Sequence, residues 1–177
     1  MDEPTRFAIA YWLIPSAPAS DYFHELIQHL ASRYDAPVFE PHLTLGVGPD
    51  YLKEAARKLA GLSHAPVELR ATSIAFTSQF TKTLFLRLRP SAALLQLRAS
   101  LGLKADQAFD PHLSLLYKKM PKEKRAQLAK EIRLPFTSVR FTSVAATRCR
   151  LPVASAADVA LWRPAGTQAM HTAGERS

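Results

Sequence analysis

The sequence predicts an α+β fold of two antiparallel sheets, and three observations support this prediction. Segments with the alternating pattern of strands are interleaved with segments of helical period along most of the chain. The thirteen prolines are spread over short connections, which is typical of many brief elements joined by tight turns. A seven-residue motif occurs twice, 70 residues apart, and indicates that the chain consists of two related halves.

The first half contains five expected elements, which alternate between strand and helix. They are a strand over 7–14, a helix from Ser20 as N-cap to Tyr34, a strand over 38–47, a helix capped by Asp50, and a strand over 67–77.

The second half repeats this alternation and adds one strand. Its expected elements are a strand over 83–89, a helix from Ser91 to about Gly102, a strand over 112–117, a basic helix from Pro121 to about Arg133, and strands over 136–148 and 159–163. We therefore expect one domain over 1–163. The remaining stretch, 164–177, has no periodicity and is predicted to be a flexible C-terminal tail.

The composition is that of a core-forming globular protein, because 47% of the 177 residues are hydrophobic. No apolar run approaches the roughly 20 residues that a membrane span requires, and the first residues do not have the pattern of a signal peptide. Cys149 is the single cysteine, so an internal disulfide is excluded. These features predict a cytoplasmic protein that has no membrane partner, and we expect a monomer.

The charge is strongly positive, with 23 Lys and Arg against 15 Asp and Glu and a net charge of +8. A surplus of this size favours phosphate-bearing partners through long-range attraction. Many basic proteins bind no nucleic acid, so the charge supports a nucleotide or RNA ligand without selecting one.

The repeated motif is the most informative feature of the sequence. Phe-Glu-Pro-His-Leu-Thr-Leu at 39–45 returns as Phe-Asp-Pro-His-Leu-Ser-Leu at 109–115, and all seven positions match if Glu and Asp, and Thr and Ser, are taken as equivalent. Chance agreement of this kind is remote. We therefore expect the two halves to be related and to face a shared site.

On a strand, side chains two residues apart point to the same face. His42 and Thr44 therefore share one face, as do His112 and Ser114, while the leucines of both motifs point to the opposite face. Two such strands that face one cleft would bring two imidazoles and two hydroxyl groups together.

This set of groups suits the hydrolysis of a strained cyclic phosphodiester. Attack on phosphorus is in line, so the entering water and the leaving oxygen lie on opposite sides. Histidine, with an unperturbed pKa of about 6.5, can take a proton from the water or give one to the leaving alkoxide. The hydroxyl groups can hydrogen-bond the non-bridging oxygens as negative charge builds there. The chemistry needs no metal ion.

A metal site is not predicted elsewhere either. The other histidines lack the spacing of metal ligands, and these are His24, His29, His64 and His171. The chain also has no acidic cluster. We therefore expect neither a metal ion nor another cofactor.

Two H-x-[T/S] motifs, separated by about half the chain, resemble the signature of the 2H phosphoesterase superfamily. Together with Tyr-Trp-Leu-Ile-Pro at 11–15 and Trp162, they are similar to its cyclic phosphodiesterase branch over residues 6–163. The resemblance implies a bilobal fold with two pseudo-symmetric lobes and a central active-site groove. It implies catalytic roles for His42 and His112 and phosphate-binding roles for Thr44, Ser114 and Tyr117.

The resemblance also implies a substrate class. ADP-ribose 1'',2''-cyclic phosphate and nucleoside 2',3'-cyclic phosphates would be hydrolysed to monophosphates, with His112 favoured as the base and His42 as the acid. Two alternatives stay open. One is a 2',3'-cyclic phosphodiesterase of RNA ends with activity like that of a 2',5'-RNA ligase. The other is a module that binds phosphates or nucleotides without turnover.

Overall fold

The computed structural model describes residues 5–104 and 108–171. It contains seven strands: β1 (Arg6–Pro15), β2 (Leu43–Pro49), β3 (Val67–Phe76), β4 (Leu84–Leu88), β5 (His112–Leu116), β6 (Ser138–Leu151) and β7 (Arg163–Ala169). The helices are α1 (Ala19–Tyr34), α2 (Leu52–Ala60), α3 (Ala92–Ser100), α4 (Lys122–Glu131) and α5 (Ala156–Ala160), with a short 3₁₀ helix, η1 (Phe80–Lys82). The α+β class that the sequence predicts is confirmed.

The strands form one antiparallel sheet in the order β1-β2-β5-β4-β3-β6-β7. Because β6 also pairs with β1, the first six strands in this order close into a ring. Exchanging β1 with β4, β2 with β5 and β3 with β6 leaves the ring order unchanged. The two halves of the chain are thus related by a pseudo-twofold exchange, as the repeated motif predicts.

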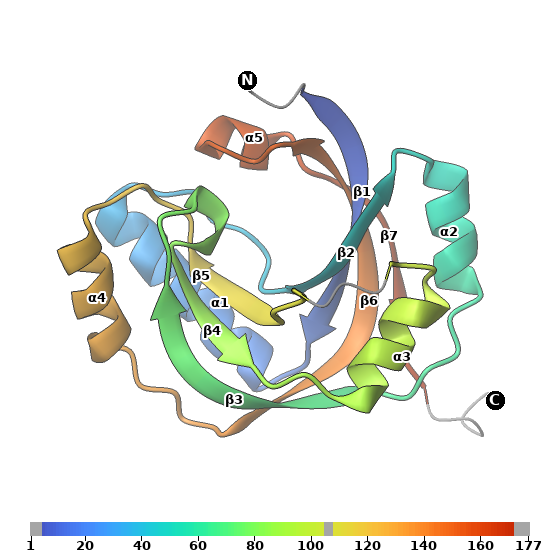
Figure 1. The fold of residues 1–177 in the computed structure, drawn as a ribbon, viewed down its shortest axis with the longest axis horizontal. Coiled ribbons are helices and arrows are strands. Elements are labelled where there is room, and N and C mark those ends of the chain that lie inside the picture. The colour runs from blue at the N-terminus through green and yellow to red at the C-terminus, as the bar shows by residue number, and fades with distance from the viewer. Residues whose placement is uncertain (1–4, 105–107, 172–177) are drawn as a thin grey trace.

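The two lobes are halves of this single sheet rather than separate sheets. Strand β6 joins them, because its first residues pair with β3 and the rest pairs with β1 on one edge and β7 on the other. Figure 1 shows the two lobes side by side, with β2 and β5 approaching each other at the centre of the molecule. This central crossing places the two repeated motifs next to one another.

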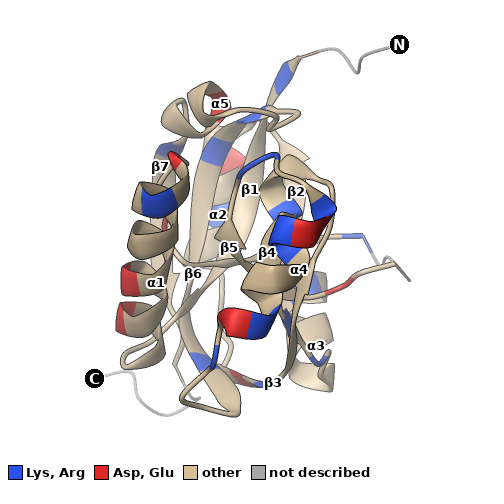
Figure 2. Cartoon of the chain, turned by 90° about the vertical axis from the view of Figure 1, so that its left-hand side faces the viewer, with Lys and Arg blue, Asp and Glu red and all other residues tan. Residues whose placement is uncertain are grey.

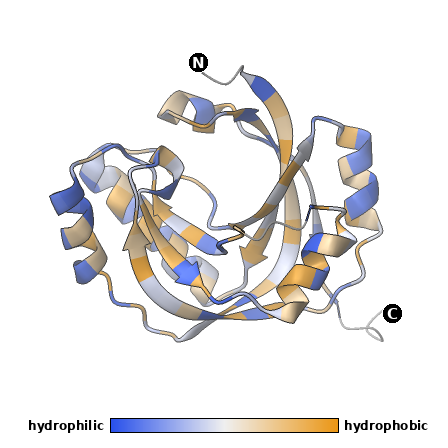
Figure 3. Cartoon of the chain, in the orientation of Figure 1, coloured by the Kyte–Doolittle hydropathy of each residue, from blue (hydrophilic) through white to orange (hydrophobic). Residues whose placement is uncertain are grey.

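The helices cover the outside of the sheet and bury its apolar face. Helix α1 packs on β5 and β1, α4 on β3 and β4, and α2 on β7 and β6. Hydrophobic residues concentrate on the strands and on the sheet-facing sides of the helices (Figure 3). Along α4, by contrast, basic and acidic residues are interspersed (Figure 2). The lysines of α4 therefore lie on a charged, solvated face rather than in the core.

Two predicted helix starts differ from the structure. The N-cap of α1 is Pro18 instead of Ser20, and the N-cap of α2 is Tyr51 instead of Asp50. The Asp50 carboxylate accepts hydrogen bonds from Arg148, with Nε–Oδ1 and Nη2–Oδ2 distances of 2.8 and 2.7 Å. A charge-assisted pair across the sheet is stronger than a local cap, so the tertiary contact determines the position of this side chain. The predicted cap at Ser91 is confirmed, since its hydroxyl accepts from the Leu94 N–H at 3.2 Å.

The prediction for the C-terminal region is wrong in two respects. Helix α5 (Ala156–Ala160) includes the first residues of the strand predicted over 159–163, and β7 (Arg163–Ala169) includes residues 164–169 of the predicted flexible tail. Strand β7 pairs with β6 from Ser143–Ala169 to Arg148–Arg163. Small and polar residues on this largely exposed edge strand hide the alternation by which a strand is normally detected. The rest of the predicted tail, 172–177, lies outside the described residues.

Within the described parts of the chain, the helices are too short or too polar to pass through a lipid bilayer.

Candidate active site

The two repeated motifs meet where β2 and β5 cross. Leu43 pairs with Leu113 in antiparallel register, and both side chains are fully buried in the main core. Extending this register by one residue in each direction sets His42 opposite Ser114 and Thr44 opposite His112. The four polar residues predicted from the sequence are therefore brought together on the face opposite to the leucines.

Each histidine lies against an aromatic ring from the strand next to its own. Trp12 of β1 stacks on His42, with ring centroids 3.9 Å apart and an interplanar angle of 16°, while Phe85 of β4 meets His112 edge-on at 5.2 Å. The two rings occupy equivalent places, because Trp12 pairs with Thr44 and Phe85 with Ser114. Both aromatic rings are buried, and they also pack against the imidazoles and hold them in place.

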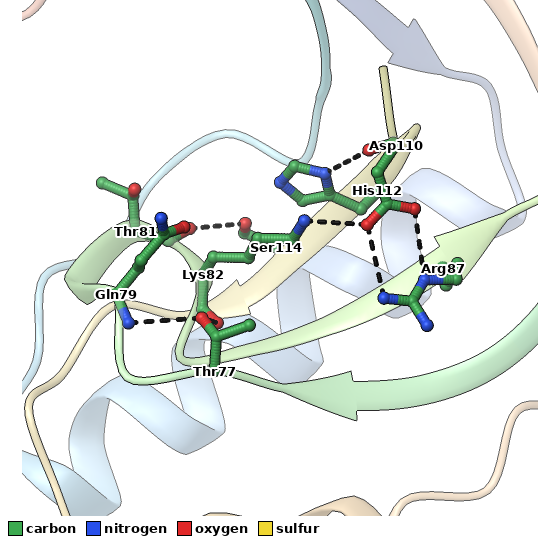
Figure 4. Close-up of polar contacts among 8 residues, drawn as sticks. All are labelled: Thr77, Gln79, Thr81, Lys82, Arg87, Asp110, His112 and Ser114. Atoms are coloured by element: carbon green, nitrogen blue, oxygen red, sulfur yellow. Dashed lines mark hydrogen bonds and ion pairs between the residues drawn. The ribbon is translucent and has the colours of Figure 1, made fainter. Parts of the chain in front are cut away.

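The two imidazoles are anchored in the same way. His42 Nδ1 lies 2.6 Å from the Glu40 carbonyl oxygen, and His112 Nδ1 lies 2.7 Å from the Asp110 carbonyl oxygen. A carbonyl oxygen can only accept, so each Nδ1 carries the hydrogen and each Nε2 is the atom that can gain or lose a proton. Figure 4 shows this contact for His112. Both rings thus present equivalent nitrogens for acid–base chemistry.

Burial lowers the pKa of both histidines. The pKa of His42 falls from 6.5 to about 4, because burial disfavours the charged ring more than the bond to Glu40 supports it, and positive charge on His112 lowers it further. The pKa of His112 is lowered first by burial and then by the charges of Lys82 and Arg87, against the opposing effects of Asp110. Without a bound anion, both rings are therefore neutral at pH 7.

Asp110 is held by two cations that sequence analysis does not identify as part of the site. Lys82 Nζ lies 2.8 Å from its Oδ2, and Arg87 Nε lies 3.1 Å from its Oδ1 (Figure 4). Burial opposes ionisation of this carboxyl group, but the hydrogen bonds and charges of both cations outweigh it, so the pKa of Asp110 lies below its usual range. The same residue supplies the carbonyl that orients His112, so the pair of cations fixes the imidazole indirectly.

The first motif has a related support. His24 Nε2 lies 3.0 Å from the Glu40 carboxylate, and Glu40 supplies the carbonyl that anchors His42. In both halves, the acidic residue two positions before the histidine is thus held through its side chain while its backbone orients the ring.

The hydroxyl groups lie in different environments. Ser114 is buried and donates to the Thr81 carbonyl at 2.7 Å. Burial raises the pKa of Tyr117, so its hydroxyl stays protonated, and its ring stacks on Phe39 at 3.8 Å. Thr44, which is partly exposed, lines a cavity of about 340 Å³ together with His112.

No three side chains among the His, Cys, Asp and Glu residues of the described chain are arranged so that they could hold a metal ion. The independence from cofactors stays a prediction.

The fold and the paired motifs agree with the comparisons to known proteins. A family model described as the 2'-5' RNA ligase superfamily matches residues 23–149, which is well over half of the chain. The protein therefore belongs to this superfamily of 2H phosphoesterases.

A protein of Arabidopsis thaliana named "Cyclic phosphodiesterase" is 22% identical over 132 residues, which cover 71% of this chain and 73% of that protein. Superfamily membership and this relative support a phosphoesterase enzyme.

Solved structures show the same fold at low sequence identity. The apo structure of Escherichia coli LigT has 17% identity and a TM-score of 0.54, and covers 93% of this chain and 98% of its own. The TT0787 protein of Thermus thermophilus has 15% identity and a TM-score of 0.60, with the same coverage. The LigT-like fold that these neighbours share confirms the predicted fold class.

Proposed function

We propose that the protein hydrolyses cyclic phosphodiesters to monophosphates by acid–base catalysis at His42 and His112, without a metal ion. The observation that carries this proposal is the pairing of Leu43 with Leu113, which sets two anchored imidazoles and two hydroxyl groups on one face. A small nucleotide cyclic phosphate is the proposed substrate. The relative named "Cyclic phosphodiesterase" supports this substrate class.

In the proposed reaction, His112 acts as the base and His42 as the acid. His112 lines the open cavity, where it can meet a water molecule and accept its proton through Nε2. His42 is buried against the face of Trp12, which favours a positively charged ring through cation–π attraction. The negative charge of a bound phosphate raises the pKa of both rings, and the reactive form is the one in which His42 carries a proton and His112 does not.

Each bond that forms and each proton that moves in this hydrolysis is accounted for. The water oxygen attacks phosphorus as His112 takes its proton, and the bond from phosphorus to the leaving ring oxygen breaks on the opposite side. His42 gives its proton to that oxygen, which becomes the hydroxyl group of the product. Thr44, Ser114 and Tyr117 stabilise the charge on the non-bridging oxygens. Transfer of a proton from His112 back to His42 through solvent restores the starting state.

A phosphodiesterase acting on RNA ends is the second candidate. It uses the same chemistry, and two observations favour it: the superfamily is described by 2'-5' RNA ligase activity, and the chain carries a net charge of +8. ADP-ribose 1'',2''-cyclic phosphate and the nucleoside 2',3'-cyclic phosphates remain the substrates proposed first.

A substrate panel in excess EDTA tests the proposal. We expect turnover of ADP-ribose 1'',2''-cyclic phosphate, of at least one of the four nucleoside 2',3'-cyclic phosphates, or of both, and the ranking of kcat/KM identifies the preferred class. Higher kcat/KM on oligonucleotides with a 2',3'-cyclic phosphate would favour RNA ends. A folded protein that binds these compounds but turns none of them over would instead be a phosphate-binding module.

A further inference from the structure

A second cavity, of about 430 Å³, shares lining residues with the one beside His112. Gly46 and Arg98 line both cavities. The second cavity is further lined by Lys58 of α2 and by Lys104, so three cationic side chains surround it. Lys58 Nζ has one acidic partner, Glu54 Oε1 at 3.1 Å. Apart from this carboxylate, the charged side chains that the described residues place at the cavity are basic, and an anion is the ligand that this charge balance favours.

The cavity lies at a place where the two repeated halves of the chain differ in sequence. Continuing the motif beyond 39–45 and 109–115, Gly46 and Gly48 correspond to Leu116 and Lys118 of the second half. Leu116 is packed in the core, and Lys118 Nζ donates to the Asp35 carbonyl at 2.7 Å. At these two positions, the second half thus has side chains where the first half has only glycine.

A side chain at Gly46 would be crowded by another residue that lines the cavity, whereas a side chain at Gly48 would make an ordinary contact. A Cβ atom at Gly46 would lie 3.1 Å from the side chain of Leu103, and one at Gly48 would lie 3.5 Å from the ring of Tyr11. The cavity thus lies where the chain departs from its internal symmetry, next to the proposed catalytic groups.

Arg98 is the buried part of the basic lining. Only 7% of the residue is exposed, its Nε donates to the Leu45 carbonyl at 2.8 Å, and its Nη2 donates to the Lys104 carbonyl at 3.2 Å. The guanidinium also lies 3.8 Å above the ring of Phe109. Among the described residues, no carboxylate pairs with it. Carbonyl groups and a ring compensate a buried cation only in part, and a phosphate would supply the missing negative charge.

We propose that the pocket formed by Lys58, Arg98 and Lys104 binds a second phosphate group of the substrate. The inference rests on the proposed function, because the shared residues Gly46 and Arg98 allow one ligand to extend from the cyclic phosphate at His112 into this pocket. The preferred substrate is then a cyclic phosphodiester that carries a further phosphate. This group is either the 5'-phosphate of a mononucleotide or the phosphodiester that precedes the last nucleotide of an RNA end.

Three adenosine substrates test the inference. They are adenosine 2',3'-cyclic phosphate, the same compound with a 5'-phosphate, and an ApA dinucleotide that ends in a 2',3'-cyclic phosphate. We expect kcat/KM of the wild type to be ~10-fold higher for at least one of the last two than for the first, because a charge-assisted phosphate contact contributes at this level. A preference for the dinucleotide would identify the RNA end as the source of the second phosphate, and a preference for the 5'-phosphate would identify the mononucleotide.

Variants that remove one positive charge show which residues cause the preference for a substrate with a second phosphate. Lys58→Gln and Lys104→Gln are each expected to lower the ratio of kcat/KM between the preferred and the bare substrate by ~3- to 10-fold. Lys53→Gln, which removes an exposed charge from the same helix as Lys58, is the matched control and should leave this ratio unchanged. A ratio near one in the wild type, or a ratio that survives in both pocket variants, would overturn the inference while leaving the proposed function intact.

A binding experiment covers the case in which no substrate is turned over. Inorganic pyrophosphate, titrated calorimetrically into the wild type and the Lys58→Gln/Lys104→Gln double variant, probes the pocket without catalysis. We expect at least ~10-fold weaker binding to the double variant. Equal affinity would refute phosphate binding in this pocket. Weaker binding to the double variant without any turnover by the wild type would refute the proposed reaction but support phosphate binding in the pocket.

Discussion

Replacing His112 with alanine is expected to lower kcat by ~10²- to 10⁴-fold, the range typical for the loss of a general acid or base. His42→Ala should have an effect of similar size, with smaller changes in substrate binding in both variants. The reason is that each ring offers Nε2 for proton transfer while Nδ1 is occupied by a backbone carbonyl. Steady-state kinetics on the best substrate of the panel measures the effect.

Asparagine variants separate loss of chemistry from loss of structure. In His112→Asn, the side-chain amide can still donate to the Asp110 carbonyl but cannot exchange a proton near neutral pH. Its kcat should therefore fall as far as that of His112→Ala while its thermal stability stays closer to the wild type. His29→Ala, an exposed position on α1, is the matched control for histidine removal. Wild-type kcat in a folded His42 or His112 variant would remove that residue from the mechanism.

The loss of a hydroxyl group should cost less than the loss of an imidazole. Thr44→Val keeps the shape of the side chain and Ser114→Ala removes one buried oxygen, and we expect each to lower kcat by ~10- to 10³-fold through weaker stabilisation of phosphate charge. Ser114 already donates to the Thr81 carbonyl, so its variant also leaves this carbonyl without that partner.

Because of that structural contribution, Ser114→Ala needs its own stability control. Unfolding in denaturant measures how much of the effect is loss of folded protein, and Ser63→Ala, an exposed loop position, controls for the removal of a serine hydroxyl group. Unchanged kcat in both Thr44→Val and Ser114→Ala would mean that these hydroxyl groups are structural only.

The sequence predicts the centre of the site well, because the motif carries its own local geometry. Alternation along a strand already sets His42 beside Thr44 and His112 beside Ser114 on one face, and the repeat predicts that the two faces meet. The structure adds the register of that meeting, in which Leu43 pairs with Leu113. No local pattern contains that register, since the two strands are far apart along the chain.

The groups that support the site could not be predicted in the same way. Lys82 and Arg87 reach Asp110 from other elements, 28 and 23 residues away in sequence. Alternation along the strand sets Arg87 on the face opposite to Leu86, but it does not show which residue Arg87 meets there. Trp12 resembles an ordinary core residue of a buried strand until its stacking on His42 is known. Strand β7 escapes detection for a different reason, because it depends on pairing with β6 rather than on an apolar pattern.

The pH dependence of kcat/KM tests the central claim, that the two histidines act as an acid–base pair, most directly. Catalysis needs one neutral and one protonated ring, so the rate should fall at low pH, where both rings are charged, and at high pH, where both are neutral. Because kcat/KM reports the free protein, and burial lowers the pKa of His42 to about 4 and that of His112 below 6.5, the profile should be bell-shaped with its maximum at or below pH 6.5. A profile in excess EDTA that stays flat from pH 5 to 9 would contradict the account.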